Sequence, residues 1–395
     1  MRKATRHDTR EHNTRLVLRT VFRHGPLSRA EIARLTHLTR ATVSDIVATL
    51  IESGLVAETG DLVASGGRPA APVDIPDDAR HVIAVDVSGE DYVGAVLTLR
   101  GRPVYQRRLP AFGACGEQAV QCLLTLIDDL LRQANAPILG IGISTPGLVD
   151  AEVGHVIRAV NRGWEDLPLR ERITQRFALP TYVANDAHMI ALAEYTFTYQ
   201  GRKRNLAVVH VSEGVGAAVI LDGALFSGDG FAAGEIGHLV IAEDGPTCTC
   251  GHRGCLETFV SIPALTRQME AALQGHVTSR WAEGSRADGR LRREDLFEAF
   301  RTGDAVATEI VHRAARRLGF AIATLVSVLD VHEVILAGQF SAFGEPILKQ
   351  IRDTVASHVL PEVAGRCQIT FSEHGDQATM LGTLALVLAK ELGIP

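Results

Sequence analysis

A change in sequence pattern near residue 80 constrains the fold most, because it divides the chain into two parts of different structural class. Before it, apolar residues recur at helical spacing, and from His81 onward strand patterns alternate with helical patterns. Residues 65–79 between the two parts are rich in Gly, Pro and Asp, a composition typical of a linker. At 395 residues the chain exceeds what one hydrophobic core usually supports, so two or three folding units are expected.

This division predicts a small helical domain followed by a two-lobed α/β body. The expected units are a disordered tail (1–12), a winged helix-turn-helix (13–66), a linker (67–80), a small lobe (81–190), a large lobe (191–375) and a C-terminal helix packing back on the small lobe (376–395).

The first part predicts short helices and a hairpin. Helical spacing covers residues 13–23, and Ser28 with Glu31 forms a capping box that opens a second helix. Thr39 caps a third helix that runs to about Ser53. Two short apolar runs, 55–57 and 62–64, flank a Thr-Gly-Asp turn and predict the wing.

The third helix has the two faces that a DNA-recognition helix needs. Its apolar residues Val43, Ile46 and Val47 face inward and leave the start of the helix polar. Such a helix enters the major groove with its early residues at the base edges. The candidate DNA contacts are Ser28, Arg29, Thr39, Arg40, Ala41, Thr42, Ser44 and Arg68. Spacing alone is equally compatible with a small helical interaction module.

The charge distribution favours a polyanion as the partner of the first part. Residues 1–70 hold eleven Lys and Arg against seven Asp and Glu, a net charge of +4. The remaining chain therefore carries −10 within the total of −6. Nucleic acid is expected to meet only the N-terminal part, because the acidic body repels it.

A cysteine-rich string predicts a metal site. Three of the six cysteines, Cys248, Cys250 and Cys255, fall within eight positions, shortly after His238. Three thiolates and one imidazole make a closed tetrahedral Zn²⁺ site of the structural type, one per chain. His252 competes with His238 as the fourth ligand, and three reduced buried cysteines are the alternative without metal.

Several strings together resemble the ROK family, which contains sugar kinases and repressors. PLSRAEIARLTHLTRATVSDIVATLIESGLV resembles its winged helix-turn-helix, and GEIGH with CTCGHRGCLE resembles its zinc element, which favours His238 as ligand. The resemblance covers residues 13–395 and implies an actin-like ATPase (ribonuclease H-like) body. One departure is His37, which stands at a turn position where the family commonly has Gly. The departure matters because His tolerates a left-handed backbone less well than Gly does.

The resemblance also implies a sugar site, in the cleft between the lobes. The implied sugar-binding residues are Gly147, Asn185, Asp186, Glu235, His238 and Glu257, with Trp164 as a weaker candidate. In ROK kinases the residue matching Asp186 deprotonates the attacking sugar hydroxyl. Without the resemblance, Asp186 would be interpreted as a helix cap and Trp164 as a core residue.

The phosphate loops depart from the kinase pattern. A DxGGT turn reads DVSGE here and ends in Glu90, and a GTGxG loop reads SEGVG and contains Glu213. A carboxylate about 4 Å from a phosphate costs roughly 4 kcal/mol at an effective dielectric near 20. A glycine-rich segment expected near the adenosine reads AGQF, which adds bulk at Gln339 and Phe340. ATP binding is therefore not expected.

These features predict a non-catalytic, sugar-responsive transcriptional regulator, most simply a repressor of carbohydrate uptake or catabolism genes. Its expected partners are duplex operator DNA, a sugar effector and a second copy of the chain, as a homodimer or a dimer of dimers. An ATP-dependent sugar kinase with an appended DNA-binding domain is the alternative, and control by a protein partner is a third. With no signal-type segment and no run of about 18 apolar residues, we expect no membrane contact and a cytoplasmic protein, associated with the bacterial nucleoid when bound to DNA.

Overall fold

The computed structural model describes residues 6–60, 71–111, 113–273, 281 and 291–394 of the chain. They form two compact units, residues 1–200 with 379–395, and residues 201–378. Among the helices that the structure describes, none is long and apolar enough to cross a membrane.

The first unit begins with the helices α1 (Arg6–His24), α2 (Arg29–Thr36) and α3 (Arg40–Glu52). The capping box that opens α2 is present, because the Ser28 side chain accepts from the Glu31 backbone and Glu31 accepts from the Ser28 backbone. Thr39 caps α3 by accepting from the Thr42 N–H at 3.2 Å. His37 ends α2 in the left-handed region with φ of 58°, so the turn forms with His in the position that Gly commonly fills.

Helix α1 begins at Arg6, which corrects the expected disordered tail over residues 1–12 for the part that is described. The added turns are polar, and their stabilisation is local. Arg15 pairs with Glu11 one turn earlier at 2.6 Å, and Asp8 lies in the first turn, where a carboxylate favours the helix dipole. A search for apolar periodicity overlooks such a solvent-exposed extension.

The wing contains a strand pair that the sequence did not predict. Strand β1 (Ala57–Glu58) pairs antiparallel with β2 (Val73–Asp74), and Val73 also bridges to Leu27. The expected partner strand, 62–64, and Arg68 lie outside the described residues. Strand β2 falls within the expected linker 67–80. The sequence pattern did not predict it, because Pro and Asp residues surround the fully buried Val73.

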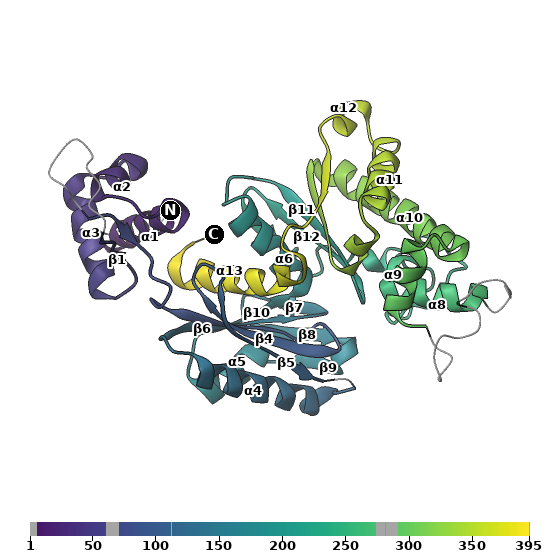
Figure 1. Ribbon diagram of the computed structural model, residues 1–395, viewed down its shortest axis with the longest axis horizontal. Helices are drawn as coiled ribbons and strands as arrows, with labels where there is room; N and C mark the ends of the chain where they lie inside the picture. The colour runs from purple at the N-terminus through teal and green to yellow at the C-terminus, as the bar shows by residue number, and fades with distance from the viewer. Residues whose placement is uncertain (1–5, 61–70, 112, 274–280, 282–290, 395) are drawn as a thin grey trace. The chain divides into compact units, whose positions relative to one another are not determined.

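The first unit continues with a sheet of strand order β10-β6-β3-β4-β5, in which β6 and β10 run parallel to β3. Helices α4 and α5 cover one face and α13 covers the other (Figure 1). Alternation along β3 explains this layering, because Ile83 packs toward α4 and Val82 toward α13. The elements are β3 (His81–Asp86), β4 (Asp91–Thr98), β5 (Pro103–Pro110), α4 (Gly116–Gln133), β6 (Ile138–Thr145), α5 (Leu169–Phe177), β10 (Thr181–Asn185) and α13 (Ala378–Leu392).

Further elements of this unit lie after β6 and β10. A small antiparallel sheet and a 3-10 turn follow β6, and a helix that ends in a π-helix follows β10. They are β7 (Leu148–Asp150), β8 (His155–Ala159), η1 (Val160–Arg162), β9 (Trp164–Leu167), α6 (Asp186–Ala193) and the π-helix η2 (Glu194–Thr198).

The second unit is built on a sheet of strand order β13-β12-β11-β14-β15. The long helix α10 supplies much of its core, and Phe340 is fully buried there. Its strands are β11 (Leu206–Val211), β12 (Val215–Leu221), β13 (Ala224–Phe226), β14 (Glu333–Ala337) and β15 (Gln368–Phe371). Its helices are η3 (Ile236–His238), α7 (Glu257–Val260), α8 (Ile262–Leu273), α9 (Arg293–Arg301), α10 (Ala305–Leu329), η4 (Gln339–Phe343), α11 (Glu345–Ala356), α12 (Pro361–Ala364) and η5 (Gly375–Gln377).

Candidate metal centre, sugar-binding residues and DNA-binding surface

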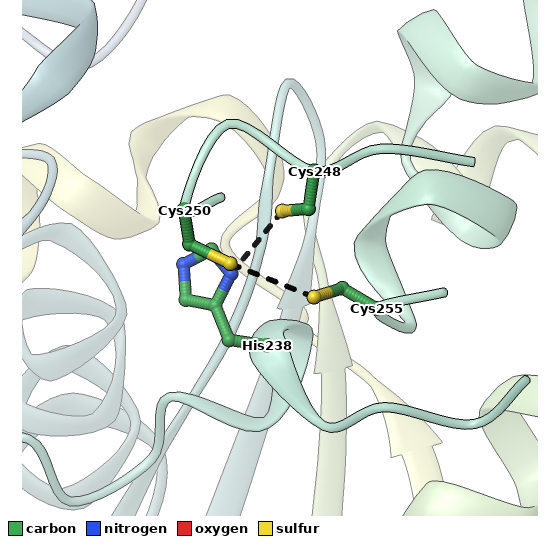
Figure 2. A group of neighbouring side chains, drawn as sticks. All are labelled: His238, Cys248, Cys250 and Cys255. Carbon is green, nitrogen blue, oxygen red and sulfur yellow. Dashed lines mark hydrogen bonds between the residues drawn. The ribbon is translucent and has the colours of Figure 1, made fainter. Parts of the chain in front are cut away.

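The sequence-predicted metal ligands lie together in the second unit. His238, Cys248, Cys250 and Cys255 place one ligand atom each within 4.8 Å of one another (Figure 2). Cys250 Sγ lies 3.6 Å from Cys255 Sγ, and Cys248 Sγ lies 3.5 Å from His238 Nδ1. A tetrahedral ion with Zn–S bonds of about 2.3 Å keeps its sulfur ligands about 3.7 Å apart, so these separations fit one ion.

Short backbone contacts hold the ligands in place. The Cys248 N–H donates to the His252 carbonyl at 2.8 Å, and Val240 bridges to Cys255. Gly254 has φ of 74°, and a Cβ there would lie 1.5 Å from the Ala242 carbonyl oxygen. The loop can therefore close around the ligands only with glycine at this position.

The thiols differ in their electrostatic surroundings. The backbone N–H of His252 lowers the pKa of Cys250 to about 6, which favours the thiolate that binds metal. Burial raises the pKa of Cys255, so a bound cation is what would hold this thiol deprotonated. His252, the alternative ligand, has Nδ1 3.5 Å from Cys250 Sγ but lies outside the group of four.

His238 connects the metal cluster to Glu235. Its Nδ1 faces Cys248, and its Nε2 lies 3.7 Å from Glu235 Oε2. One imidazole can therefore serve a metal through Nδ1 and keep Nε2 for a carboxylate or a ligand hydroxyl.

Glu257 is tied to the loop between β11 and β12. Its Oε2 accepts from the Val215 N–H at 3.1 Å. A Cβ at Gly214 would lie 2.9 Å from the same oxygen. The carboxylate of Glu257 is thus held against the loop, and it is not the solvated surface group that its type alone would suggest.

In the first unit, Asn185 caps α6. Its Oδ1 accepts from the Ala187 N–H at 2.9 Å, and its Nδ2 donates to the Gly147 carbonyl at 2.9 Å. Gly147 has φ of 88°, and a Cβ there would lie 2.2 Å from the Arg158 carbonyl oxygen. Asn185 is therefore the N-cap residue, and it brings Gly147 to the start of the helix. The Asp186 carboxylate also accepts from the Ala187 N–H, at 2.8 Å.

Asp186 is the first residue of α6. Burial, together with the nearby Asp86 carboxylate, raises the pKa of Asp186 to about 7. Asp86 itself accepts from the Ser88 N–H at 3.0 Å and the Ser88 hydroxyl at 2.6 Å. A carboxyl group that titrates near neutrality can accept a proton from a hydroxyl or merely accept a hydrogen bond from it.

Trp164 is a core residue in this structure. It is 3% exposed and packs against the α4 side of the sheet. Its indole N–H donates to the Gly116 carbonyl at 3.0 Å. This placement agrees with the interpretation made from residue type alone, and not with a direct sugar contact.

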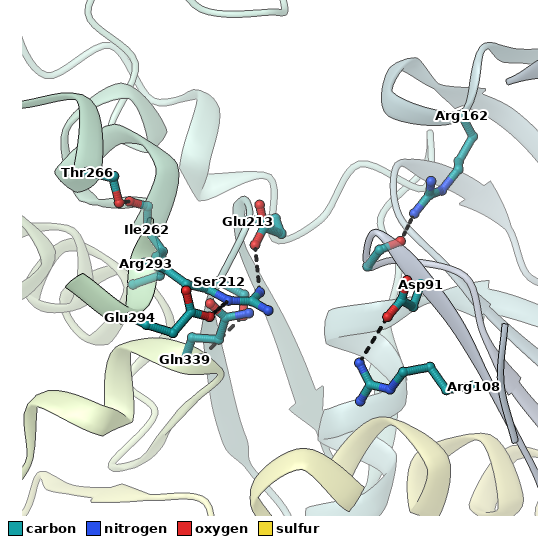
Figure 3. A network of polar contacts seen from close by, with 11 residues as sticks. Asp91, Arg108, Arg162, Ser212, Glu213, Ile262, Thr266, Arg293, Glu294 and Gln339 are labelled. Atoms are coloured by element: carbon teal, nitrogen blue, oxygen red, sulfur yellow. Dashed lines mark hydrogen bonds and ion pairs between the residues drawn. The ribbon is translucent and has the colours of Figure 1, made fainter. Parts of the chain in front are cut away.

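The loop that contains Glu213 is held by contacts within the second unit. Arg293, at the start of α9, lies between Glu213 and Glu294, with N–O distances of 3.5 and 2.9 Å (Figure 3). The Gln339 N–H donates to the Ser212 hydroxyl at 3.2 Å. Phe340 points into the core, so it does not supply the bulk near an adenosine that the sequence suggested.

Arg162 fixes the β3–β4 turn, a role that sequence reasoning missed. Its guanidinium, labelled in Figure 3, donates to the Gly89 carbonyl. It also donates to the Val87 carbonyl at 2.7 Å and lies over the Tyr92 ring at 5.1 Å. Arg162 and Arg293 carry no spacing signal, because each contacts a loop far away in the sequence.

The candidate DNA-binding residues differ in how available they are. Arg40, Ala41 and Ser44 are exposed at the start of α3. Thr39 and Thr42 share a hydrogen bond at 2.8 Å between their hydroxyls. The remaining two of the described candidates have partners within the domain, since Ser28 is buried in its capping box and Arg29 pairs with Glu58 of β1 at 2.8 Å.

Comparison with known proteins assigns the family. The family model described as ROK family matches residues 82–390, and one described as MarR family matches residues 13–62. The chain belongs to the ROK family. Its N-terminal part is a MarR-like winged helix-turn-helix and its body is the sugar-kinase-like α/β body of ROK proteins, so the predicted fold class is confirmed.

This ROK chain is similar to both repressors and kinases. It is 32% identical over 388 residues to the xylose repressor of Caldicellulosiruptor bescii, with 97% of each chain covered. It is also 32% identical over 317 residues to a glucokinase of Halalkalibacterium halodurans, with 79% of this chain and 96% of the glucokinase covered. A solved ROK family transcriptional regulator, a homologue of the Escherichia coli MLC protein, matches with a TM-score of 0.84 and 26% identity over 98% of each chain.

Proposed function

We propose that this ROK protein is a sugar-responsive transcriptional repressor that binds operator DNA through its winged helix-turn-helix. The observation that carries the proposal is that one chain contains both a recognition helix and a ROK body. The start of that helix is polar and exposed. The full-length similarity to a xylose repressor supports it, because both parts are covered.

The sugar site is proposed on the residues that each unit presents. Asn185 and Asp186 lie at the start of α6, beside the Gly147 carbonyl. Glu235, Glu257 and the Nε2 atom of His238 lie around the metal cluster and the β11–β12 loop. Carboxylates and imidazole nitrogens that accept hydroxyl protons are the expected means of recognising a polyol.

The metal is proposed to be one structural Zn²⁺ per chain. The donor set of three thiols and one imidazole is the one that closed zinc sites use. When bound, the ion would hold the loop that carries Glu235 and His238, and it would contribute no open coordination position to a reaction.

The protein is proposed to act as a homodimer or a dimer of dimers at the nucleoid of a bacterial cytoplasm. A winged domain that reads one half-site binds weakly alone, whereas two domains in one dimer read a pseudo-palindromic operator. A sugar that changes the separation of the two domains would then release the DNA.

A sugar kinase is the second candidate function. The pKa of Asp186 near 7 suits a general base, and the similarity to a glucokinase supports this candidate. Glu90 and Glu213 oppose it, because each places a carboxylate where a kinase of this family binds phosphate.

One set of measurements tests both candidates. A duplex selected from a random library with the purified protein serves as operator, and its affinity is measured with and without D-xylose, D-glucose or N-acetyl-D-glucosamine. Loss of DNA binding with one of these sugars supports the repressor. ATP turnover with a sugar, abolished by Asp186→Asn, would replace it with the kinase. Sugar-independent DNA binding and no sugar-induced thermal stabilisation would favour control by a protein partner.

A further inference from the structure

The winged domain is joined to the rest of the first unit by polar contacts to helix ends. Among the described residues, arginines at three positions each donate to a main-chain carbonyl at or just after a helix end. The pairs are Arg100 with Phe22 of α1 at 3.0 Å, Arg80 with Ser53 after α3 at 2.7 Å, and Arg19 with Gly393 after α13 at 2.9 Å. Carbonyls at helix ends lack partners within the helix, so these bonds satisfy them and fix the domain.

This joint is not packed uniformly. A continuous apolar cluster runs from α1 and α3 to α13 and the sheet. Beside it lies a groove of about 340 Å³ between α1 and residues 391–392, and another of about 620 Å³ between the wing and residues 76–80. These grooves interrupt the packing between the winged domain and the rest of the first unit beside that cluster.

One aromatic contact connects the winged domain to a helix in the rest of the first unit. The ring of Phe22, near the end of α1, lies 6.4 Å from the ring of Phe197. The Arg100 guanidinium lies 5.7 Å from the Phe22 ring centre and also pairs with Asp74 of β2. A displacement of Phe197 would therefore also displace Phe22, Arg100 and strand β2.

Phe197 belongs to the π-helix that ends α6. The Tyr199 N–H donates to the Glu194 carbonyl at 2.9 Å, five residues back, which is the π pattern. The buried Glu194 carboxylate accepts from the Thr198 hydroxyl at 2.7 Å and steadies this turn. A π-turn contains one residue more than an α-turn, and its loss rotates the residues that follow by about 100°. Conversion of this π-turn to an α-turn would therefore shift Phe197 and the residues that follow it.

The opposite end of the same helix carries two of the proposed sugar-binding residues. Asn185 caps α6 while it donates to Gly147, and Asp186 is the first helical residue. A hydroxyl that donates to Asn185 Oδ1 competes there with the Ala187 N–H, which Asp186 Oδ1 also accepts at 2.8 Å. Ligand binding at this end would therefore act on the first hydrogen bonds of the helix that continues into the π-turn containing Phe197.

We propose that α6 and its π-turn transmit sugar occupancy at Asn185 and Asp186 to the Phe22–Phe197 contact, which repositions the winged domain on its arginine joint. This inference rests on the proposed repressor function and names the element that couples its two sites. Phe197 acts as a positioning residue, since its proposed effect passes through the ring of Phe22.

The test uses the full-length protein with Phe197→Leu, which keeps an apolar side chain but removes the ring. Phe177→Leu is the matched control, because Phe177 is also half-buried in this unit but packs in the other apolar cluster. Operator affinity is measured by fluorescence anisotropy with and without sugar. The sugar used is whichever of D-xylose, D-glucose and N-acetyl-D-glucosamine releases the wild-type protein from the operator. Sugar affinity is measured by calorimetry on each variant.

The expected result is a loss of coupling alone. Wild type and Phe177→Leu should lose on the order of 10- to 100-fold in operator affinity when the sugar binds. Phe197→Leu should bind sugar and sugar-free operator within about threefold of wild type, yet lose less than about threefold of its operator affinity with sugar.

The two failures are distinguishable. Undiminished release of Phe197→Leu by a sugar that releases the wild type overturns the coupling inference and leaves the repressor function intact. Loss of sugar binding in Phe197→Leu also overturns it, because the residue would then support the site itself. If no sugar releases the wild type, the proposed function fails and the inference fails with it.

Discussion

His238 Nε2 lies 3.7 Å from Glu235 Oε2, while the Nδ1 atom of the same ring faces Cys248. The ring therefore joins the metal cluster to a candidate sugar-binding carboxylate. A metal bound through Nδ1 would fix the orientation of the imidazole and hence of the Nε2 atom that Glu235 faces.

Removal of one thiolate should release the metal. We expect about one zinc per chain in the wild type and well under half of that in Cys250→Ser, because three remaining ligands bind zinc more weakly than four. Elemental analysis of the purified proteins measures it. Cys367→Ser is the control, since Cys367 lies outside the cluster. Full zinc content in Cys250→Ser would refute the assigned ligand set.

Asp186 should make stability depend on pH. Its pKa is about 7 in the folded protein but near 3.8 when unfolded, so between these values the folded state holds the extra proton. The free energy of unfolding should therefore fall as pH rises from about 4 to 7, by up to about 4 kcal/mol, with no further change from this group above pH 8.

Asp186→Asn serves as the comparison for this effect. It removes the titration while other groups still titrate, so the difference between the two proteins isolates Asp186. Denaturant melts at pH 5 and pH 8 should show the wild type losing more stability than Asp186→Asn between these pH values. Parallel losses in both proteins would contradict the raised pKa.

Arg40 should contribute directly to DNA binding, because it is exposed as the first residue of α3. We expect Arg40→Ala to weaken operator binding by about 1–3 kcal/mol if the contact is to a base. If the contact is to a phosphate, the salt dependence should decrease by about one unit of slope. Anisotropy titrations at several salt concentrations separate the two. Arg366→Ala, an exposed arginine of the second unit, should change neither quantity.

Trp164 should matter for stability more than for sugar binding. Trp164→Phe leaves the Gly116 carbonyl without its donor at 3.0 Å and removes part of a buried ring. We expect a loss of about 1–3 kcal/mol in the free energy of unfolding, with sugar affinity unchanged. Chemical denaturation and calorimetry measure the two. A normal stability with reduced sugar affinity would place Trp164 in the sugar site instead.

Local signals in the sequence predicted well the features that depend on local physics. The caps at Ser28 and Thr39 were found from side chains that bond to backbone groups three residues away. The alternation of strand and helix patterns after residue 80 predicted an α/β body. The three cysteines of the metal cluster lie within one short loop, so their closeness in sequence already places them close in space.

Features that depend on distant residues could not be predicted in the same way. Strand β2 lies in a segment with linker composition, and it forms only because β1 and Leu27 offer it partners. Arg162 and Arg293 hold loops from which they are separated by about seventy or more residues. No spacing rule connects such residues.

The sequence by itself determined the helix caps and the zinc-type donor set, because capping and ligand spacing are encoded over a few residues. Its resemblance to the ROK family indicated the winged helix-turn-helix and the ROK body, which periodicity alone left open. Only the tertiary structure decided that Asn185 is the N-cap residue of α6, that Asp186 titrates near neutrality, and that Phe197 meets Phe22. The physical reason is that burial, the neighbouring Asp86 carboxylate and an aromatic contact across about 175 residues depend on how distant segments pack.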